Sequence, residues 1–233
     1  MNEKKIAIIG SGTAGLIAAL IIKSLFESYT VTVVSSSKKG IIGVGEGSTE
    51  HWRIFQDLVG IRADDMVKNA DITHKYGIRY ENWTNHTPDY FHSVGGTGLN
   101  VNTFFGSYAY ALENELLLTN TFSWKGLVDD KIVDLGSNTH LGCNQYHFDT
   151  FKLNSFLTNI ARSKKIVFID DEVSDLKIDE DGYIESIYLN NNKKYLEADF
   201  FVDATGFNRE ILSKISDQTF IPYRKYLPCD KAI

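Results

Sequence analysis

The chain has 233 residues, of which 43% are hydrophobic and 23% charged, a composition typical of a soluble globular protein. Its formal net charge of −6 argues against a nucleic-acid-binding surface. The two cysteines, Cys143 and Cys229, are too few and too far apart for a disulfide framework, which favours a reducing, cytoplasmic compartment. No segment reaches the roughly 20 unbroken apolar residues that a membrane span requires.

A strand, a glycine turn, a helix and a second strand are predicted over the first 35 residues. The β-branched run Lys5–Ile9 is typical of a buried parallel strand, and Thr30–Val34 repeats the pattern. Between them, the apolar segment Leu16–Phe26 predicts a helix. The glycine turn is a G-x-G-x-x-G, written out as Gly10-Ser11-Gly12-Thr13-Ala14-Gly15.

Each glycine of this turn has a mechanical role in dinucleotide binding. Gly10 permits the tight turn, Gly12 lets the backbone approach a pyrophosphate, and Gly15 lets the helix pack closely on the strand. The helix N-terminus offers unpaired N–H groups to the phosphates. The motif therefore predicts dinucleotide binding, and a glycine turn without a ligand is the alternative.

The end of the second strand departs from the dinucleotide-binding pattern. An acidic residue for the ribose hydroxyls is expected there, but the chain reads Ser35-Ser36-Ser37. A serine hydroxyl still hydrogen-bonds a ribose, although without the added strength that a charged acceptor supplies.

A second glycine-rich stretch, the glycine loop, spans residues 43–49 and reads Gly43-Val44-Gly45-Glu46-Gly47-Ser48-Thr49. Its Ser-Thr end predicts a helix N-cap, followed by a helix with one apolar face that ends at Gly60. The glycine loop is either a plain turn or backbone lying against a flat ligand, an approach that glycine permits.

Lys75 lies within residues 72–80, which alternate as a strand and follow a short helix predicted over residues 63–69. Its neighbours are aromatic and apolar. Taken alone, a lysine in such a strand is more often a solvated edge residue than a catalytic one.

The pattern becomes irregular from Trp83 to Tyr146, where only Tyr108–Leu118 looks helical, and this is typical of a substrate-facing insertion. His140, Cys143 and His147 lie near one another in the sequence. A fourth ligand is lacking and the spacing fits no common zinc pattern, so no metal site is predicted.

Regular structure is predicted again from Tyr146 onward. A helix starts at Asp149, a strand covers residues 165–170, and strands 172–178 and 183–189 are joined by a turn at Asp181-Gly182. A buried strand from Ala198 ends in Asp203-Ala204-Thr205-Gly206. Asp203 and Gly206 then lie at the strand's carboxyl end, where open α/β sheets bind ligands.

The predicted fold class is therefore α/β, with a discontinuous Rossmann-like nucleotide fold. This fold takes in about residues 1–80 and 145–215, and an irregular, substrate-facing insertion occupies about residues 81–144.

Together these residues resemble the flavin-dependent halogenase family, of which the tryptophan halogenases are best known. The resemblance covers essentially the whole chain, but only the family's N-terminal half. The glycine turn matches the family's FAD pyrophosphate motif, the glycine loop resembles its loop beside the flavin, and Lys75 falls where the family carries its catalytic lysine. Tyr146-His147-Phe148-Asp149 and the stretch from Asp203 to Phe207 are likewise similar to the family.

The resemblance implies a single FAD-binding domain over residues 1–233, of the glutathione-reductase type and truncated at its C-terminus. It also implies that Val173 meets the adenine through its backbone. The residues expected to bind the cofactor are Gly10, Gly12, Thr13, Ala14, Gly15, Ser35, Val44, Gly45, Glu46, Gly47, Ser48, Val173, Asp203 and Gly206.

The implied chemistry uses reduced FAD delivered by a separate flavin reductase, dioxygen, and a halide as co-substrate. The product is hypohalous acid, which Lys75 would hold by a hydrogen bond or as a haloamine beside an aromatic substrate such as tryptophan or another indole. A lysine suits this role because its ammonium donates hydrogen bonds and its free amine can be chlorinated.

The chain departs from the family at its end. It stops at Ile233, in a region that the family follows with much more protein, and no Trp-x-Trp-x-Ile-Pro occurs in it. We therefore expect a fragment, half of a split enzyme completed by a partner chain, or a product without activity. Uncovered apolar surface would then favour aggregation or association with another chain.

Two other functions are also consistent with the sequence. One is a non-catalytic FAD-binding module that works only with a partner chain. The other is a different FAD-dependent monooxygenase, which would share the fold without requiring Lys75.

Overall fold

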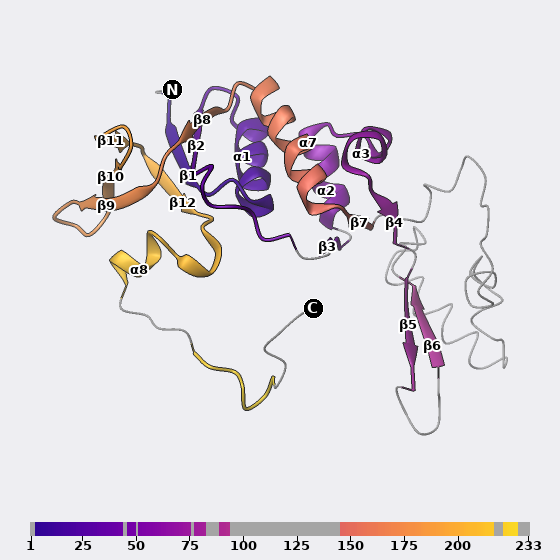
Figure 1. Ribbon diagram of the computed structural model, residues 1–233. Helices are drawn as coiled ribbons and strands as arrows, with labels where there is room; N and C mark the ends of the chain where they lie inside the picture. Colours follow the sequence, from indigo (N-terminus) through magenta and orange to yellow (C-terminus); the bar gives the residue numbers. More distant parts are fainter. Residues whose placement is uncertain are drawn as a thin grey trace. The chain divides into compact units, whose positions relative to one another are not determined.

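The computed structural model describes residues 3–43, 46–49, 51–75, 77–82, 89–93, 145–216 and 221–227 (Figure 1). The chain divides into two compact units: unit 1 comprises Met1–Ile42 and Leu157–Ile233, and unit 2 comprises Gly43–Phe156. The single domain over residues 1–233 stays a prediction. The helix expected over Tyr108–Leu118 and most of the expected insertion lie outside the described residues.

A four-stranded parallel sheet forms the centre of unit 1, in the strand order β12-β1-β2-β8 (Figure 1). The first two strands of the chain are β1 (Lys5–Ile9) and β2 (Thr30–Ser35). They confirm the two strands that were predicted from the β-branched runs. The strand expected over residues 165–170 is β8 (Val167–Asp170), which begins later because Lys165 takes left-handed backbone with φ 62°.

The strand predicted as buried near the C-terminus is an edge strand among the described residues. It is β12 (Phe200–Asp203), which pairs with β1, and Phe200 is 61% exposed. The expectation of burial was wrong here because an apolar run does not tell a central strand from an edge strand.

Unit 1 has three layers, with the parallel sheet in the middle. On one face, α1 (Thr13–Leu25) packs against β1 and β2. An antiparallel meander packs on the other face through Ile187 and Leu189, which contact Ala7 and Ile9 in one buried cluster. The meander has the order β11-β10-β9 and consists of β9 (Val173–Ile178), β10 (Ile184–Leu189) and β11 (Lys194–Glu197).

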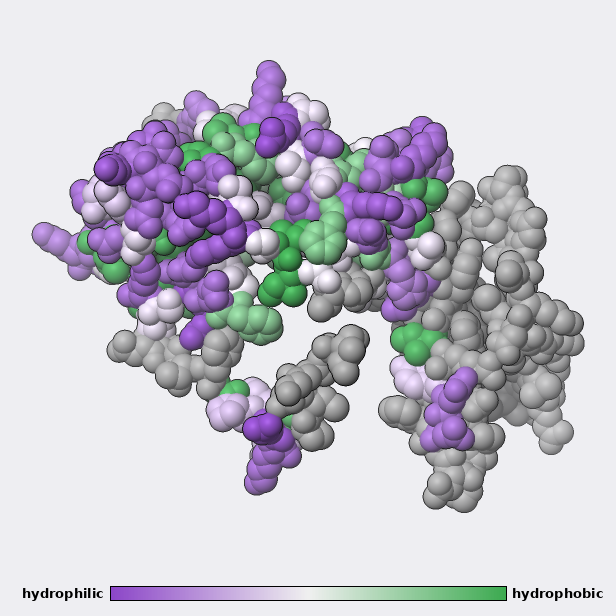
Figure 2. Space-filling view, in the orientation of Figure 1, coloured by the Kyte–Doolittle hydropathy of each residue, from purple (hydrophilic) through white to green (hydrophobic). Residues whose placement is uncertain are grey.

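The polarity of the surface of unit 1 differs between the meander and the segment after β12. Figure 2 shows that hydrophilic residues dominate the outer surface of the meander. After β12, in contrast, large apolar side chains are exposed, including Phe207, Ile221 and Tyr226. The expected association with another chain stays a prediction, and these residues are where it would be sought.

A small antiparallel sheet organises unit 2 and joins strands that are far apart in the sequence. Its order is β3-β7-β4, formed by β3 (Glu46–Gly47), β7 (Tyr146–Phe148) and β4 (Thr73–His74). The predicted helices are confirmed as α2 (His51–Val59) and α3 (Ala63–Ala70). Trp52 of α2 packs on Phe148 of β7, with ring centroids 4.7 Å apart, so α2 is held on this sheet.

The boundary between the two units falls within α7 (Thr150–Ser163). This helix begins as predicted after Asp149, whose carboxylate accepts hydrogen bonds of 3.0 Å from the N–H groups of Phe151 and Lys152. Asp149 is thus an N-cap that satisfies donors of the first helical turn.

The strand predicted over residues 72–80 is divided in two. The chain leaves β4 after His74 and continues as β5 (Gly77–Glu81), which pairs with β6 (Asp89–Ser93) in place of β7. Lys75 lies at the point where the chain changes its pairing partner. In addition, β6 is regular structure within the stretch that was expected to be irregular.

Asp171 is a buried carboxylate that fastens the meander to the parallel sheet. It accepts hydrogen bonds from the N–H groups of Glu172 (2.7 Å), Asn191 (2.7 Å) and Asn192 (3.0 Å) and from Nδ2 of Asn192 (2.7 Å). Its own N–H donates to the carbonyl of Ser35 at 3.0 Å. Burial acts to raise the pKa of Asp171, but these hydrogen bonds outweigh it and lower the pKa below the ordinary value.

The substitution Asp171→Asn should lower the free energy of unfolding at pH 7 by about 1–3 kcal/mol, because the amide places a donor against backbone N–H groups. Since the folded-state pKa is depressed, the stability that Asp171 supplies is present above its unfolded pKa of about 4 and is lost as the pH falls through the folded value. Urea unfolding at pH 7 and pH 3, followed by circular dichroism, measures both effects.

The matched control is Asp181→Asn, in which an exposed aspartate of the turn before β10 is changed. The account of Asp171 would be contradicted if Asp171→Asn lost as much stability on acidification as the unchanged protein and Asp181→Asn do.

Candidate functional site

Two glycines of the glycine turn are required by close backbone packing within unit 1. Gly10 has φ 109°, and its N–H donates to the carbonyl of Val34 at 2.8 Å. A Cβ at Gly10 would collide with the carbonyl of Ala204, and a Cβ at Gly15 would collide with the carbonyl of Gly10. Hence the end of β1, the start of α1 and the end of β12 can meet only if both positions are glycine.

Gly12 is different, because its packing within the protein does not require a glycine. It is the N-cap of α1, with φ −66° and ψ 177°, and a Cβ there would meet nothing within 4 Å. No side chain caps this helix, and its first turn, which starts with Thr13 and Ala14, holds no acidic residue. The positive end of the helix dipole therefore faces open space at Gly12, which fits an anionic group such as the pyrophosphate of FAD.

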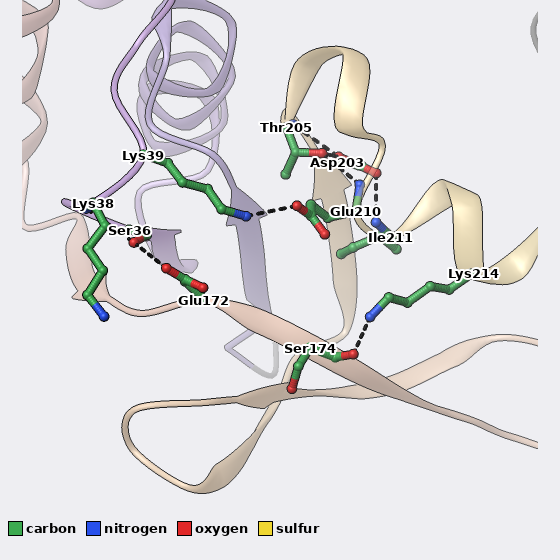
Figure 3. A network of polar contacts seen from close by, with 10 residues as sticks. All are labelled: Ser36, Lys38, Lys39, Glu172, Ser174, Asp203, Thr205, Glu210, Ile211 and Lys214. Atoms are coloured by element: carbon green, nitrogen blue, oxygen red, sulfur yellow. Dashed lines mark hydrogen bonds and ion pairs between the residues drawn. The ribbon is translucent and has the colours of Figure 1, made fainter.

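Acidic side chains lie next to the carboxyl end of β2, although β2 itself ends at Ser35 and is followed by two more serines. Ser35 pairs in register with Asp170 of β8, and Asp170 accepts a 2.8 Å hydrogen bond from the N–H of Ser37. This hydrogen bond is the main cause that lowers the pKa of Asp170. Ser36 Oγ donates to Glu172 Oε1 at 3.0 Å (Figure 3).

Sequence reasoning did not select these acidic residues. The run Asp170-Asp171-Glu172 begins at the last residue of a predicted strand, at the carboxyl end where parallel sheets bind ligands, and this position could have indicated them. The expected adenine contact, Val173, follows at the start of β9.

Asp203 holds the loop that follows β12. Its carboxylate accepts hydrogen bonds from the N–H of Thr205 (3.0 Å), from Thr205 Oγ1 (2.6 Å) and from the N–H of Ile211 (3.0 Å) (Figure 3). It also accepts a hydrogen bond from the N–H of Leu212 at 2.9 Å. Burial acts to raise the pKa of Asp203, but these donors outweigh it and lower the pKa. A contact between Asp203 and the cofactor stays a prediction, and the structure supports a positioning role for this residue.

An ion pair connects the loop after β2 with the loop after β12. Lys39 Nζ lies 2.9 Å from Glu210 Oε1, and the hydrogen bond to Glu210 is the main cause that raises the pKa of Lys39 (Figure 3). Gly206, with φ 65°, begins the short helix η2 (Gly206–Asn208) of this second loop, which is followed by α8 (Leu212–Ile215).

In unit 2, β7 pairs with part of the glycine loop on one side and with the strand that directly precedes Lys75 on the other. Gly47 of β3 and Thr73 of β4 both pair with His147, from opposite sides of β7. Ser48 and Tyr146 exchange two hydrogen bonds, of 2.8 Å and 2.9 Å, across 98 residues of sequence. The half-buried Lys75 donates its N–H to the carbonyl of Gln145 at 2.9 Å.

The glycine loop is explained in part by packing within unit 2. A Cβ at Gly43 would collide with the ring of Phe151, but this exposed side chain can turn aside, so packing favours a glycine here without requiring one. Val44 and Gly45 lie outside the described residues, and Glu46 and Gly47 form β3. The ligand-facing interpretation of residues 44–48 therefore stays a prediction.

The structure assigns the expected site residues to the two units as follows. Unit 1 holds Gly10, Gly12, Thr13, Ala14, Gly15, Ser35, Val173, Asp203 and Gly206, and unit 2 holds Glu46, Gly47, Ser48 and Lys75. Within the described ranges, no group of three or more His, Cys, Asp and Glu could hold a metal ion, and His140 and Cys143 lie outside those ranges. Among the residues that the structure describes, no helix is long and apolar enough to cross a membrane.

Comparison with known proteins gives consistent matches over nearly the whole chain. A family model described as tryptophan halogenase matches residues 5–233. The 7-chloro-L-tryptophan 6-halogenase KtzR of Kutzneria sp. (strain 744) is 29% identical, over 97% of this chain and 49% of its own length. The tryptophan 6-halogenase SttH of Streptomyces toxytricini is 26% identical, over 100% of this chain and 49% of its own.

Solved structures agree with these matches. The crystal structure of SttH from Streptomyces toxytricini superimposes with a TM-score of 0.79 at 25% identity, over 98% of this chain and 49% of its own. Tar14, a tryptophan C-6 flavin-dependent halogenase (chlorinase) from taromycin biosynthesis, gives 0.78 at 28% identity, over 97% and 48%. The chain thus spans about half the length of the relatives it matches.

The three glycines of the glycine turn should respond differently to substitution by alanine. Gly12→Ala should leave the thermal unfolding midpoint nearly unchanged but weaken FAD binding about tenfold or more, because its Cβ projects into the space where a pyrophosphate would approach. Gly10→Ala and Gly15→Ala should each cost more than about 2 kcal/mol of stability, because they force backbone apart. Thermal unfolding and quenching of flavin fluorescence measure the two effects. An unchanged FAD affinity in Gly12→Ala would refute the assignment of the phosphate contact.

Proposed function

This chain belongs to the tryptophan halogenase family, and we propose that it is a flavin-dependent halogenase, in whole or in its N-terminal part, that acts on tryptophan or another indole. The observation that carries the proposal is the sheet β3-β7-β4, which joins the glycine loop to the segment bearing Lys75. A different FAD-dependent monooxygenase would share the nucleotide-binding layers of unit 1 without requiring a lysine in this place.

The residues of unit 1 fit the ADP portion of FAD. The open end of α1 at Gly12 suits the pyrophosphate, and the backbone of Val173 is the proposed adenine contact. When bound in its reduced form, FAD supplies two electrons and the halide two more, which together reduce dioxygen to hypohalous acid and water. A separate flavin reductase is the proposed source of the reduced cofactor, and the cytoplasm is the proposed compartment.

Lys75 is the proposed residue that receives the hypohalous acid. Its ammonium offers three donors, so it can hydrogen-bond the oxygen of the acid and leave the halogen directed at an electron-rich ring carbon. The backbone hydrogen bond from Lys75 to Gln145 fixes where the side chain starts. Its half-buried position limits the water that competes for the oxidant.

The match to only half of each relative favours a second candidate function. In it, the chain is a FAD-binding module that becomes active only with the part of the enzyme equivalent to the other half of the relatives. That part would come from the same polypeptide or from a partner chain. Its proposed contact surface is the exposed apolar region after β12.

The purified protein, supplied with FAD, a flavin reductase, NADH, halide and tryptophan, should yield halogenated product detectable by mass spectrometry. Lys75→Ala should lower the product about 100-fold or more, because the oxidant loses its hydrogen-bond donor, while FAD affinity stays unchanged. The matched control is Lys68→Ala on the exposed face of α3, which should behave as the unchanged protein.

The outcomes separate the candidates. Undiminished product with Lys75→Ala would disprove the role of the lysine. Bound FAD without product, followed by product once a polypeptide equivalent to the relatives' second half is added, would support the module. An absence of FAD binding would contradict both candidates.

A further inference from the structure

We propose that Glu172, held in place by Ser36, binds the ribose hydroxyls of the FAD adenosine and replaces the acidic residue that the end of β2 lacks. The inference rests on the proposed FAD binding and assigns one residue to one part of the cofactor.

The strand order places Glu172 where a ribose would lie. The carboxyl ends of β1, β2 and β8 are neighbours, since Gly10 donates its N–H to Val34 and Ser35 pairs with Asp170. The glycine turn is on one side of the end of β2, and Glu172 and Val173 are on the other. In FAD the ribose lies between the pyrophosphate and the adenine, in the same order as the glycine turn, the end of β2 and Val173.

The backbone N–H, the backbone carbonyl and the carboxylate of Glu172 each form a hydrogen bond within the protein. Its N–H donates to Asp171 at 2.7 Å, its carbonyl accepts from the N–H of Asn190 at 3.0 Å, and its carboxylate accepts from Ser36 Oγ at 3.0 Å. Figure 3 shows the Ser36–Glu172 pair beside the Lys39–Glu210 ion pair. Because the side chain is half-buried and already oriented, little conformational entropy would be lost when a ligand binds.

The chemistry of a carboxylate suits a vicinal diol. An ionised carboxylate only accepts hydrogen bonds, through about four lone-pair positions, and Ser36 occupies one of them. Two neighbouring hydroxyls can therefore donate to those that remain, and hydrogen bonds to a charged acceptor are about twice as strong as neutral ones. Among the described residues, the nearby Lys39 forms its ion pair with Glu210, and no ion pair engages Glu172.

The two other acidic residues of this run have different tasks. Asp171 is buried and accepts four hydrogen bonds that hold the meander. Asp170 accepts from the N–H of Ser37 and so shapes the turn after β2. Asp170 is exposed and is the competing candidate for the ribose, which makes it a necessary part of the test.

The test compares the displacement of bound FAD by ADP and by 2′-deoxy-ADP, followed by flavin fluorescence. The unchanged protein should prefer ADP about tenfold or more, because the 2′-hydroxyl donates to a charged acceptor. Glu172→Gln should reduce the preference to about threefold or less and weaken FAD binding about tenfold. Ser36→Ala should give an intermediate preference. Glu185→Gln, an exposed glutamate of β10, should match the unchanged protein.

The preference is a ratio measured within each variant, so a smaller folded fraction does not alter it. If Glu172→Gln binds FAD and keeps the full preference for ADP, the assignment is overturned while the proposed function stands. If the preference is lost in Asp170→Asn instead, the ribose contact belongs to Asp170 and the assignment is likewise overturned. If the unchanged protein binds no FAD, the proposed function fails first.

Discussion

The proposed nucleotide-binding edge of unit 1 depends on a contact between backbones. Gly10 lies against the carbonyl of Ala204, and Gly15 lies against the carbonyl of Gly10, so that no side chain fits between the end of β1, the start of α1 and the end of β12. This contact aligns the carboxyl ends of the parallel strands and leaves the N-terminus of α1 open at Gly12. The other residues of unit 1 that are proposed to bind FAD lie at or just after the carboxyl ends of these parallel strands.

Carboxylates shape the loops that follow the parallel strands. Asp203 holds the loop after β12 with four hydrogen bonds, and Asp171 holds the meander against β8 with another four. Both carboxylates accept hydrogen bonds from donors of the protein itself, and these bonds lower the pKa of both residues despite burial. The carboxylate of Glu172 accepts a hydrogen bond from Ser36 and has acceptor positions left for a ligand, unlike the carboxylate of Asp171.

Local sequence patterns predicted the glycine turn, β1, β2, α2, α3 and α7. Strand runs, helix caps and turn glycines depend on residues that are close in the sequence, so they can be recognised there. Three features could not be obtained in this way. The edge position of β12, the change of pairing partner at Lys75, and the contact between Ser36 and Glu172 all depend on pairings between distant parts of the chain. A serine-rich strand end indicated a missing charge, but only the strand order shows which residue is near enough to supply it.

The central claim is that unit 1 recognises the ADP portion of FAD. Isothermal titration calorimetry of the purified protein with FAD and with FMN, which lacks the adenosine monophosphate part, tests it most directly. The account predicts one FAD bound per chain, at least about tenfold more tightly than FMN. Equal affinities for the two flavins, or no binding of FAD in either redox state, would contradict it.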